Sequence, residues 1–450
     1  MLHGISRVGA LLSLLLIYKS AGAQTDPAPA PVTAQQVQAL LEQLASQEAR
    51  IRQLEAKVQQ LSGPTLVAAA APDAIPVPAV VAPATILADA APVAAPQEPA
   101  PEEETHDHMM EVPHGPVLHF RGFFDFDFDK GTVAQQLQYP IGVPGTTTFR
   151  AGEFDLFMTS QLSENLSFLS ELVLATDPTN AFGLDIERFQ LTYRPTKYFE
   201  ISGGRFHTDI GFYNTAFHHG TWFSTATGRP FMYYFEDAGG MLPVHEVGVT
   251  TTGLIPGTGK MNLHWTAEVG NGSAEFGTPL FGDGVENFVS DRNRKDVNIA
   301  FYSKPEWADG LQFGGSYLTG DLIPANTNLK VNQEISSAYV VFINSKWEFM
   351  NEIVLLQHQI TDGGRSFNSP MGYTQLAYRF GKYRPYFRWQ EVNIPNNDPV
   401  TAFKGRYEGP SVGMRVDFFS YAAFKVQYNR VYLRNAEAQN GIELQTAFTF

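Results

Sequence analysis

The last ten residues of the chain alternate between two faces, which is the period of a β-strand. One face of this predicted strand carries Ile442, Leu444, Thr446, Phe448 and Phe450. A strand at the edge of a sheet leaves backbone N–H and C=O groups without partners unless another strand covers it. The first strongly alternating stretch, 119–129, is the expected partner. This pairing would close the sheet into a barrel, and a sheet must be closed to cross a membrane.

Similar alternating segments follow one another from residue 119 to the end of the chain. Most have about ten residues, the length that a tilted strand needs to cross a bilayer. The pattern predicts an all-β fold, a transmembrane antiparallel up-and-down β-barrel of about sixteen strands over residues 119–450. The predicted strands are 119–129, 149–163, 166–176, 184–194, 199–207, 244–255, 260–270, 296–304, 311–320, 335–345, 347–360, 371–381, 384–393, 406–418, 422–434 and 441–450.

The connections between these segments alternate between short and long. Barrels of bacterial outer membranes have short periplasmic turns and longer outer loops, so both ends of the barrel segment are expected on the periplasmic side. The short connections lie near Asn165, Lys197, Gly257, Trp307, Lys346, Tyr383 and Ser420. The long ones span 130–148, 208–243, 271–295, 321–334, 361–370 and 394–405, and two shorter ones on the same side lie near Pro178 and Asn435.

The residues 262–269 show which face of the barrel is apolar. One face holds Leu263, Trp265, Ala267 and Val269, and the other holds Asn262, His264, Thr266 and Glu268. A barrel with a water-filled interior turns its polar face inward and its apolar face outward, the reverse of a soluble barrel. We therefore expect the outer face of this barrel to contact a lipid bilayer.

The composition agrees with an exported membrane protein. The 450 residues include no cysteine, 17% are charged and 13% are aromatic. The formal net charge of -15 argues against a nucleic-acid partner. Outside the N-terminal leader, no run of about 18 apolar residues predicts a spanning helix.

Three segments are predicted before the barrel. Residues 1–23 have the basic residue, apolar stretch and small-residue end of a secretory signal peptide. Residues 33–62 carry a heptad repeat, which predicts a short periplasmic coiled-coil helix that associates with other copies. Its β-branched core residues favour two helices, although Gln47 weakens that preference. Residues 63–118 form an Ala/Pro-rich linker, since their prolines exclude a continuous helix.

The end of this linker is rich in His and Met. His106, His108 and His114 are candidate ligands for copper, zinc or nickel. Their spacing matches no rigid metal site, so a polar linker beside the membrane is the favoured interpretation. No other cofactor is expected.

The longest connection, 208–243, is rich in Phe, Tyr and Trp. Aromatic side chains are unusual in a loop that faces water, and a loop of roughly 35 residues in a compact domain is commonly functional. These side chains would be buried if the loop folded into the barrel. The loop would then narrow a lumen that is too wide for wall side chains to fill.

In this pattern residues 119–450 resemble the trimeric sixteen-stranded porins of bacterial outer membranes, whose third outer loop forms the constriction. Loop 208–243 is likewise the third predicted outer loop. The helical arm and linker are similar to those of some phosphate-selective O/P-type porins. The resemblance implies an outer-membrane homotrimer with its arm in the periplasm. It also implies passive diffusion of small hydrophilic solutes or ions.

Because alternate residues of a strand face opposite sides of the sheet, the position of a charged residue relative to its apolar neighbours predicts whether it faces the lumen. Arg205 joins this set only if Gly203 and Gly204 form a bulge, because it otherwise shares a face with Ile201. The candidate basic pore-lining residues are Arg188, Arg205, Arg379, Arg388, Arg415 and Lys425, four of them from the twelfth to fifteenth predicted strands. The acidic candidates are Asp125, Asp127, Glu153, Asp155, Glu236 and Asp237. Patches of charge in a narrow pore set ion selectivity, and the basic patch would favour anions.

Two alternatives to a porin remain open. In the first, a plugged barrel is a structural tether whose helical arm binds the cell wall or a periplasmic partner. In the second, the barrel takes up metal ions captured by the His/Met-rich stretch. An enzyme is not expected, because Ser224 and His245 form no recognisable nucleophile–base set and the chain has no GxSxG or HExxH motif.

Overall fold

The computed structural model describes residues 116–130, 147–176, 182–217, 220–235, 240–272, 294–324, 329–361, 363–402, 405–434 and 437–450. Contacts divide the chain into two units, Met1–Asp89 and Ala90–Phe450, and all described residues belong to the second. The predicted signal peptide and coiled-coil helix, and His106, His108 and His114, lie outside the described residues. No helix in the described part of the chain is long and apolar enough to cross a membrane.

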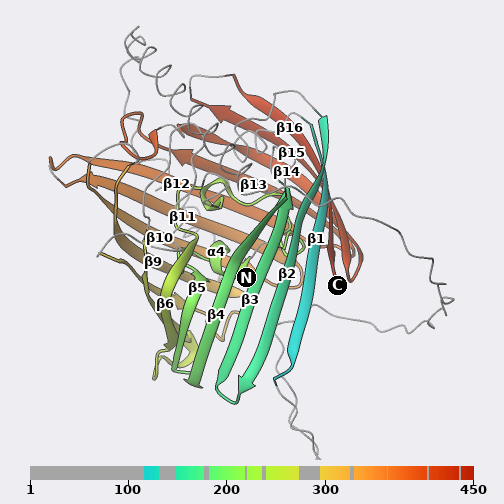
Figure 1. Cartoon of the computed structure of the whole chain (residues 1–450). Helices are drawn as coiled ribbons and strands as arrows, with labels where there is room; N and C mark the ends of the chain where they lie inside the picture. Colours follow the sequence, from blue (N-terminus) through green and yellow to red (C-terminus); the bar gives the residue numbers. More distant parts are fainter. Residues whose placement is uncertain are drawn as a thin grey trace, which may run out of the picture. The chain divides into compact units, whose positions relative to one another are not determined.

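Sixteen strands form one closed antiparallel barrel, in which each strand pairs with its neighbours in the chain (Figure 1). The strands are β1 (Leu118–Lys130), β2 (Thr147–Ser163), β3 (Leu166–Thr176), β4 (Phe182–Thr196), β5 (Phe199–His207), β6 (His245–Leu254), β7 (Leu263–Gly270), β8 (Asp296–Ser303), β9 (Leu311–Leu322), β10 (Val331–Ile343), β11 (Trp347–Ile360), β12 (Ser366–Tyr378), β13 (Tyr383–Asn393), β14 (Arg406–Phe419), β15 (Ala422–Leu433) and β16 (Gln439–Thr449). The predicted fold class and strand count are confirmed.

Pairing of β1 with β16 closes the barrel, as the sequence predicts. The register runs from Phe123 opposite Thr449 to Lys130 opposite Ile442. Beyond β16, Phe450 and Gly122 exchange two backbone hydrogen bonds of 2.8 and 3.0 Å. A Cβ on Gly122 would lie 2.3 Å from the exposed Phe450 ring, so this ring lies directly over Gly122 at the seam.

Most strand bounds agree with the prediction within two residues. At two short connections the strands are three residues shorter than predicted, since β7 begins at Leu263 instead of 260 and β12 ends at Tyr378 instead of 381. Two strands are longer than predicted at their outer-loop ends. β10 begins at Val331 instead of 335, and β12 begins at Ser366 instead of 371. Both extensions pair with β11, whose ladder with β10 reaches Ile360 and whose ladder with β12 reaches Gln359. The predicted alternation of short and long connections is also confirmed, since β10 and β11 are joined by 344–346 and β5 and β6 by 208–244.

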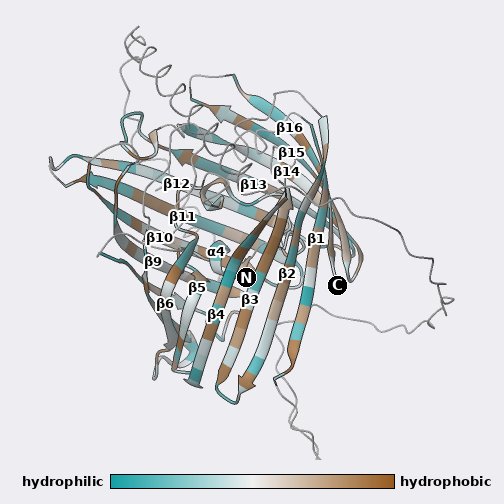
Figure 2. Cartoon of the chain, viewed as in Figure 1, coloured by the Kyte–Doolittle hydropathy of each residue, from teal (hydrophilic) through white to brown (hydrophobic). Residues whose placement is uncertain are grey.

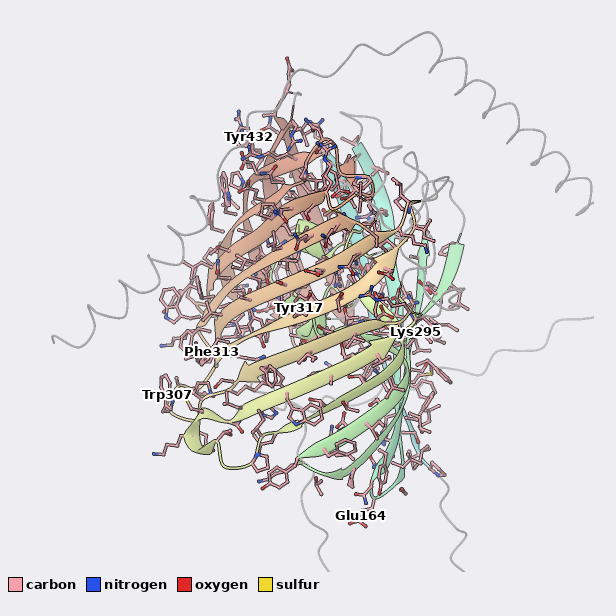
Figure 3. The ribbon with its side chains drawn as sticks, turned by 90° about the vertical axis from the view of Figure 1, so that its left-hand side faces the viewer. Glu164, Lys295, Trp307, Phe313, Tyr317 and Tyr432 are labelled. Atoms are coloured by element: carbon pink, nitrogen blue, oxygen red, sulfur yellow. The ribbon has the colours of Figure 1, made fainter. Side chains whose placement is uncertain are left out.

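Side chains alternate between the two faces of the barrel, and the outer face is apolar. On β7, Thr266 and Glu268 are buried inside, whereas Val269 is 48% exposed outside. Hydropathy accordingly alternates along many of the strands (Figure 2). On the wall that contains β9, Tyr317 is exposed between Trp307 at the short-connection end and Lys295 at the opposite end (Figure 3). Exposed large apolar residues of this kind occur on nearly every strand.

Gly204 interrupts the regular conformation of β5. Its φ is +135°, and a Cβ there would lie 1.8 Å from the backbone oxygen of Phe189. The pairing passes through Gly203, Gly204 and Arg205 without a shift, so a bulge does not form there. Arg205 is nevertheless buried, and its Nε donates a 3.1 Å hydrogen bond to the backbone oxygen of Glu187.

We expect Gly204→Ala to destabilise the barrel by about 1–3 kcal/mol, because only glycine adopts this φ without strain. The measurement is the temperature at which the detergent-solubilised barrel loses its β-sheet circular dichroism. Gly203→Ala is the matched control, because a Cβ at Gly203 meets no atom within 4 Å. Equal melting temperatures for the two variants would contradict the assigned role of Gly204.

Candidate functional site

The described parts of the connection 208–244, which are 208–217, 220–235 and 240–244, lie in the interior of the barrel, and we call them the inner segment. The short helix α4 (Tyr213–Ala216) and the 3-10 turn η1 (Phe231–Tyr233) belong to it, and α4 lies within the ring of strands in Figure 1. Apolar side chains of the segment form one buried cluster with inward-facing residues of β10 to β15, among them Ile335, Met371 and Val392. The segment therefore packs mainly against this half of the barrel wall, and its Phe223 ring also contacts the Phe123 ring of β1 at 4.8 Å.

Aromatic contacts explain why this connection is rich in Tyr and Phe. The Tyr213 ring stacks on Phe217 and Tyr233, with centroid distances of 4.7 and 5.8 Å. Phe231 meets Tyr407 of β14 edge to face at 5.1 Å. Burial of such side chains contributes both apolar area and ring–ring geometry, so these contacts hold the segment in one position.

Glu352 of β11 anchors the beginning of the segment. Its carboxylate accepts the backbone N–H groups of Phe212 and Tyr213 at 2.7 and 2.9 Å. It also accepts the hydroxyl groups of Tyr233 at 2.9 Å and Tyr373 at 2.5 Å. Glu352 is fully buried, so these four hydrogen bonds replace the water that the carboxylate loses.

Three basic side chains of the wall hold the middle of the segment, and we call Arg388, Arg415 and Lys425 the clasp. They donate hydrogen bonds to backbone carbonyl groups between residues 221 and 228. The bonds run from Arg388 to Gly228 (2.8 Å), from Arg415 to Trp222 (2.5 Å) and Ser224 (2.8 Å), and from Lys425 to Thr221 (2.6 Å) and Ala226 (3.2 Å).

Acidic side chains of the wall bind the same stretch through hydroxyl groups. Thr225 donates to Glu348 at 2.6 Å, and Thr227 donates to Glu443. Glu348 lies on β11 and Glu443 on β16, so the stretch is held from both sides of the clasp. The combined contacts fix the middle of the inner segment over β11 to β16.

The other predicted basic residues lie apart from the segment. Arg379 donates to Asp417 at 2.6 Å, and Asp417 also accepts Arg415 at 2.7 Å. Arg188 pairs with Glu171 at 2.5 Å on the opposite side of the barrel. The structure thus brings together Arg379 and the three clasp residues, whereas Arg188 and Arg205 lie on β4 and β5.

The predicted acidic residues of β1 and β2 face the interior as neighbours. The Glu153 N–H donates to Asp125 at 3.1 Å, and Asp127 pairs with Arg150 at 2.8 Å. Asp155 is buried beside them. Glu236 and Asp237 lie outside the described residues. The pore-lining roles of all these residues stay predictions.

A second outer connection also bends onto the inner wall. His358 of β11 contacts the Asp398 carboxylate at 2.8 Å and the Gln333 side chain at 3.1 Å. Asp398 accepts the backbone N–H groups of Val400 and Thr401, which shapes the loop around it. Sequence reasoning missed Glu352 and this His–Asp pair, although the parity of β11 places Glu352 and His358 inward. No group of three or more potential metal ligands occurs in the described parts of the chain.

At the beginning of the inner segment, Asp209 lies beside the carboxyl group of Glu268 on β7. The Asp209 N–H donates to Glu268 at 3.0 Å, and Asn298 donates to Glu268 at 2.7 Å and to the Asp209 backbone oxygen at 3.2 Å. Burial raises the pKa of Asp209 to about 6, against smaller opposing effects of Thr266 and Lys304. Protonation of this site therefore stabilises the attachment of the segment to β7 and β8.

The two halves of the inner wall differ in exposure. Inward-facing residues of β10 to β15 are almost all buried, such as Gln375 and Ser411. Inward-facing Thr159, Gln190 and Thr252, on β2, β4 and β6, are only half-buried. On the same three strands, inward-facing Asp155, Glu187 and Glu246 are buried. The inner segment therefore covers the wall of β10 to β15, and half-buried inward-facing residues lie along part of β2, β4 and β6.

Comparison with known proteins supports the fold. No family model matches the chain, and no curated protein matches it. The outer-membrane channel DcaP of Acinetobacter baumannii has 9% sequence identity and a TM-score of 0.52, with 76% of this chain and 99% of that chain covered. That likeness shows a shared barrel fold.

Two further solved structures have lower TM-scores. An anion-selective porin from Comamonas acidovorans has 10% identity and a TM-score of 0.49, with 74% of this chain and all of that chain covered (100%). Salmonella typhi OmpF, in a complex with daunomycin, has 10% identity and a TM-score of 0.49, with 76% and 100% covered.

We expect Glu352→Gln to loosen the start of the inner segment, because the variant loses a charged acceptor of four hydrogen bonds. A hydrogen bond to a charged group contributes about 1.5–3 kcal/mol, so amide hydrogen exchange at Phe212 and Tyr213 should accelerate roughly tenfold or more. Glu334→Gln on the outer face of β10 is the control. Exchange that is equally slow in both variants would contradict the anchoring role.

The Asp209 site predicts a pH dependence. An acid whose pKa is higher in the folded state stabilises that state when protonated, and this stabilisation declines as pH rises from the ordinary Asp value through about 6. Hydrogen exchange of residues 208–216, corrected for its intrinsic pH dependence, should therefore be slower at about pH 5 than at about pH 7.5. Asp209→Asn should remove most of this difference. A difference that persists unchanged in the variant would exclude Asp209 as its source.

Proposed function

We propose that the protein is an outer-membrane porin through which small hydrophilic solutes or ions diffuse passively. The observation that carries this proposal is the unequal exposure of the inner wall. A barrel of sixteen strands is too wide for its own side chains to fill, and the inner segment packs mainly against the wall from β10 to β16, with further contacts to β1, β7 and β8. Half-buried polar residues on β2 to β7 then border a water-filled passage, and the inner segment constricts it.

The outer face supports the membrane location. Exposed Phe, Leu, Val and Ile side chains cover it on nearly every strand, and a closed barrel leaves no unpaired strand edge in lipid. DcaP is described as an outer-membrane channel, and the shared fold is consistent with the same location here. We further propose that three copies associate, and that the predicted arm, residues 33–62, extends into the periplasm.

The tethering barrel is the second candidate. It is favoured by how firmly the inner segment is held, because a segment with so many buried contacts could serve as a permanent plug. It is opposed by the half-buried polar residues of the uncovered wall, which a dry plug would not leave exposed to water. The metal-uptake alternative depends on residues outside the described parts of the chain. Enzymatic activity is not part of the proposal.

Planar-bilayer recording tests the proposal directly. We expect the purified protein to conduct ions in discrete steps, and we expect replacement of residues 212–235 by a short Gly/Ser linker to increase the step size. The reason is that this deletion removes the part of the inner segment that narrows the lumen. An intact, folded protein that conducts no ions would contradict the porin and favour the tether.

Deletion of residues 33–62 is the matched control for this experiment. A porin should keep its conductance per barrel without the arm, since the passage lies in the barrel. Circular dichroism and detergent-phase mass would show whether each deletion variant still forms the barrel and whether its oligomeric state has changed.

A further inference from the structure

The clasp residues face the inner segment instead of an open passage. Arg388, Arg415 and Lys425 are 1%, 5% and 0% exposed. Their charged groups point at backbone carbonyl groups of residues 221–228, which lie between the clasp and the rest of the interior. These three side chains therefore act as positioning residues that hold the segment.

On the wall under the segment, the basic side chains have acidic side chains close to them. Arg415 pairs with Asp417 at 2.7 Å, and Arg384 lies 3.6 Å from Glu348. Glu443 and Glu352 add two further carboxylates to the same half of the barrel. The basic patch is thus offset by nearby acids as well as being covered.

The opposite wall has a different charge. In the described residues of β1 to β4, inward-facing carboxylates outnumber inward-facing basic side chains. The carboxylates include Asp125, Asp127, Asp129, Asp155, Glu171 and Glu187. Ion pairs engage Arg150 with Asp127 and Asp129, and Arg188 with Glu171, and the Glu187 carboxyl group lies 2.9 Å from His245. The excess on this wall is negative.

The open and half-open side chains lie on this acidic side. Gln190 and Thr192 of β4, Thr159 of β2 and Glu153 of β2 are half-buried, as is Asp185 at the outer end of β4. Glu153 and Asp185 are therefore the acidic side chains of this wall that contact water, whereas the six carboxylates named above are as deeply buried as the clasp. A fixed charge at the border of a narrow, low-dielectric passage is screened less than one on a protein surface, so its sign controls which ions enter.

We propose that the passage runs between the inner segment and the inner wall of β2 to β6, and that the half-buried carboxylates Glu153 of β2 and Asp185 of β4 make it selective for cations. This inference rests on the proposed porin function and names its solute class: small inorganic and organic cations. It reverses the anion preference that the basic patch alone suggests, because the segment covers that patch.

Reversal potentials in a KCl gradient test the charge selectivity. Potassium should be more permeant than chloride in the wild-type protein. Glu153→Gln combined with Asp185→Asn should shift the reversal potential towards that of an unselective pore. The matched control, Glu164→Gln with Glu306→Gln, removes the same charge from exposed positions in two short connections and should leave the reversal potential unchanged.

Cysteine labelling tests where the passage runs, since the chain has no cysteine of its own. Gln190→Cys places a thiol on the uncovered wall, and Ser411→Cys places one beneath the inner segment. A charged methanethiosulfonate reagent should reduce the current through Gln190→Cys and leave the current through Ser411→Cys unchanged. Labelling in detergent with a mass readout confirms that each variant is folded and shows which thiol reacts.

The outcomes separate this inference from the porin proposal. Absence of any conductance would overturn both. Conductance with chloride more permeant than potassium would overturn the cation selectivity and leave the porin intact. Block of Ser411→Cys without block of Gln190→Cys would place the passage along the clasp and overturn the inferred route.

Discussion

The structure depends on the pairing of its first and last strands. An open sheet in a lipid bilayer would expose two rows of unpaired backbone N–H and C=O groups, and each such group is costly there. The ladder from Phe123–Thr449 to Lys130–Ile442 removes both edges at once. With the edges removed, the outer face can be apolar without promoting aggregation through strand addition, and the interior can hold polar side chains.

Closure over sixteen strands creates a second constraint, an interior too wide for wall side chains to fill. The inner segment meets this constraint on one side only. Inward-facing residues of a water-filled barrel are usually polar, but under the segment some are apolar. Ile335, Met371 and Val392 face inward there and pack against aromatic side chains of the inner segment. On β1 and β4, away from that core, inward-facing Asp125, Asp127 and Gln190 are polar. The barrel thus combines a soluble-like core on one wall with polar side chains on the other.

Much of this architecture could be predicted from the sequence because it follows from local periodicity. The strand count, the closure and the alternation of connections all follow from the period of two and the connection lengths. The early start of β12 could not, since Ser366 and Asn368 show no apolar alternation and join the sheet by pairing with β11. The anchoring role of Glu352 was also missed, because its partners Phe212 and Tyr213 lie about 140 residues away in the chain.

The site was harder to predict because parity determines only which face a side chain occupies. Arg188 of β4 and Arg388 of β13 are both inward-facing arginines, and sequence alone treats them alike. In the structure, Arg188 pairs with Glu171 on the partly open wall, whereas Arg388 holds Gly228 of the inner segment. Their environments differ because the inner segment, which connects β5 and β6, passes over Arg388 and not over Arg188. Charge in a pore therefore acquires its role from what covers it, and a list of lumen-facing residues becomes a prediction of selectivity only after the path of that segment is known.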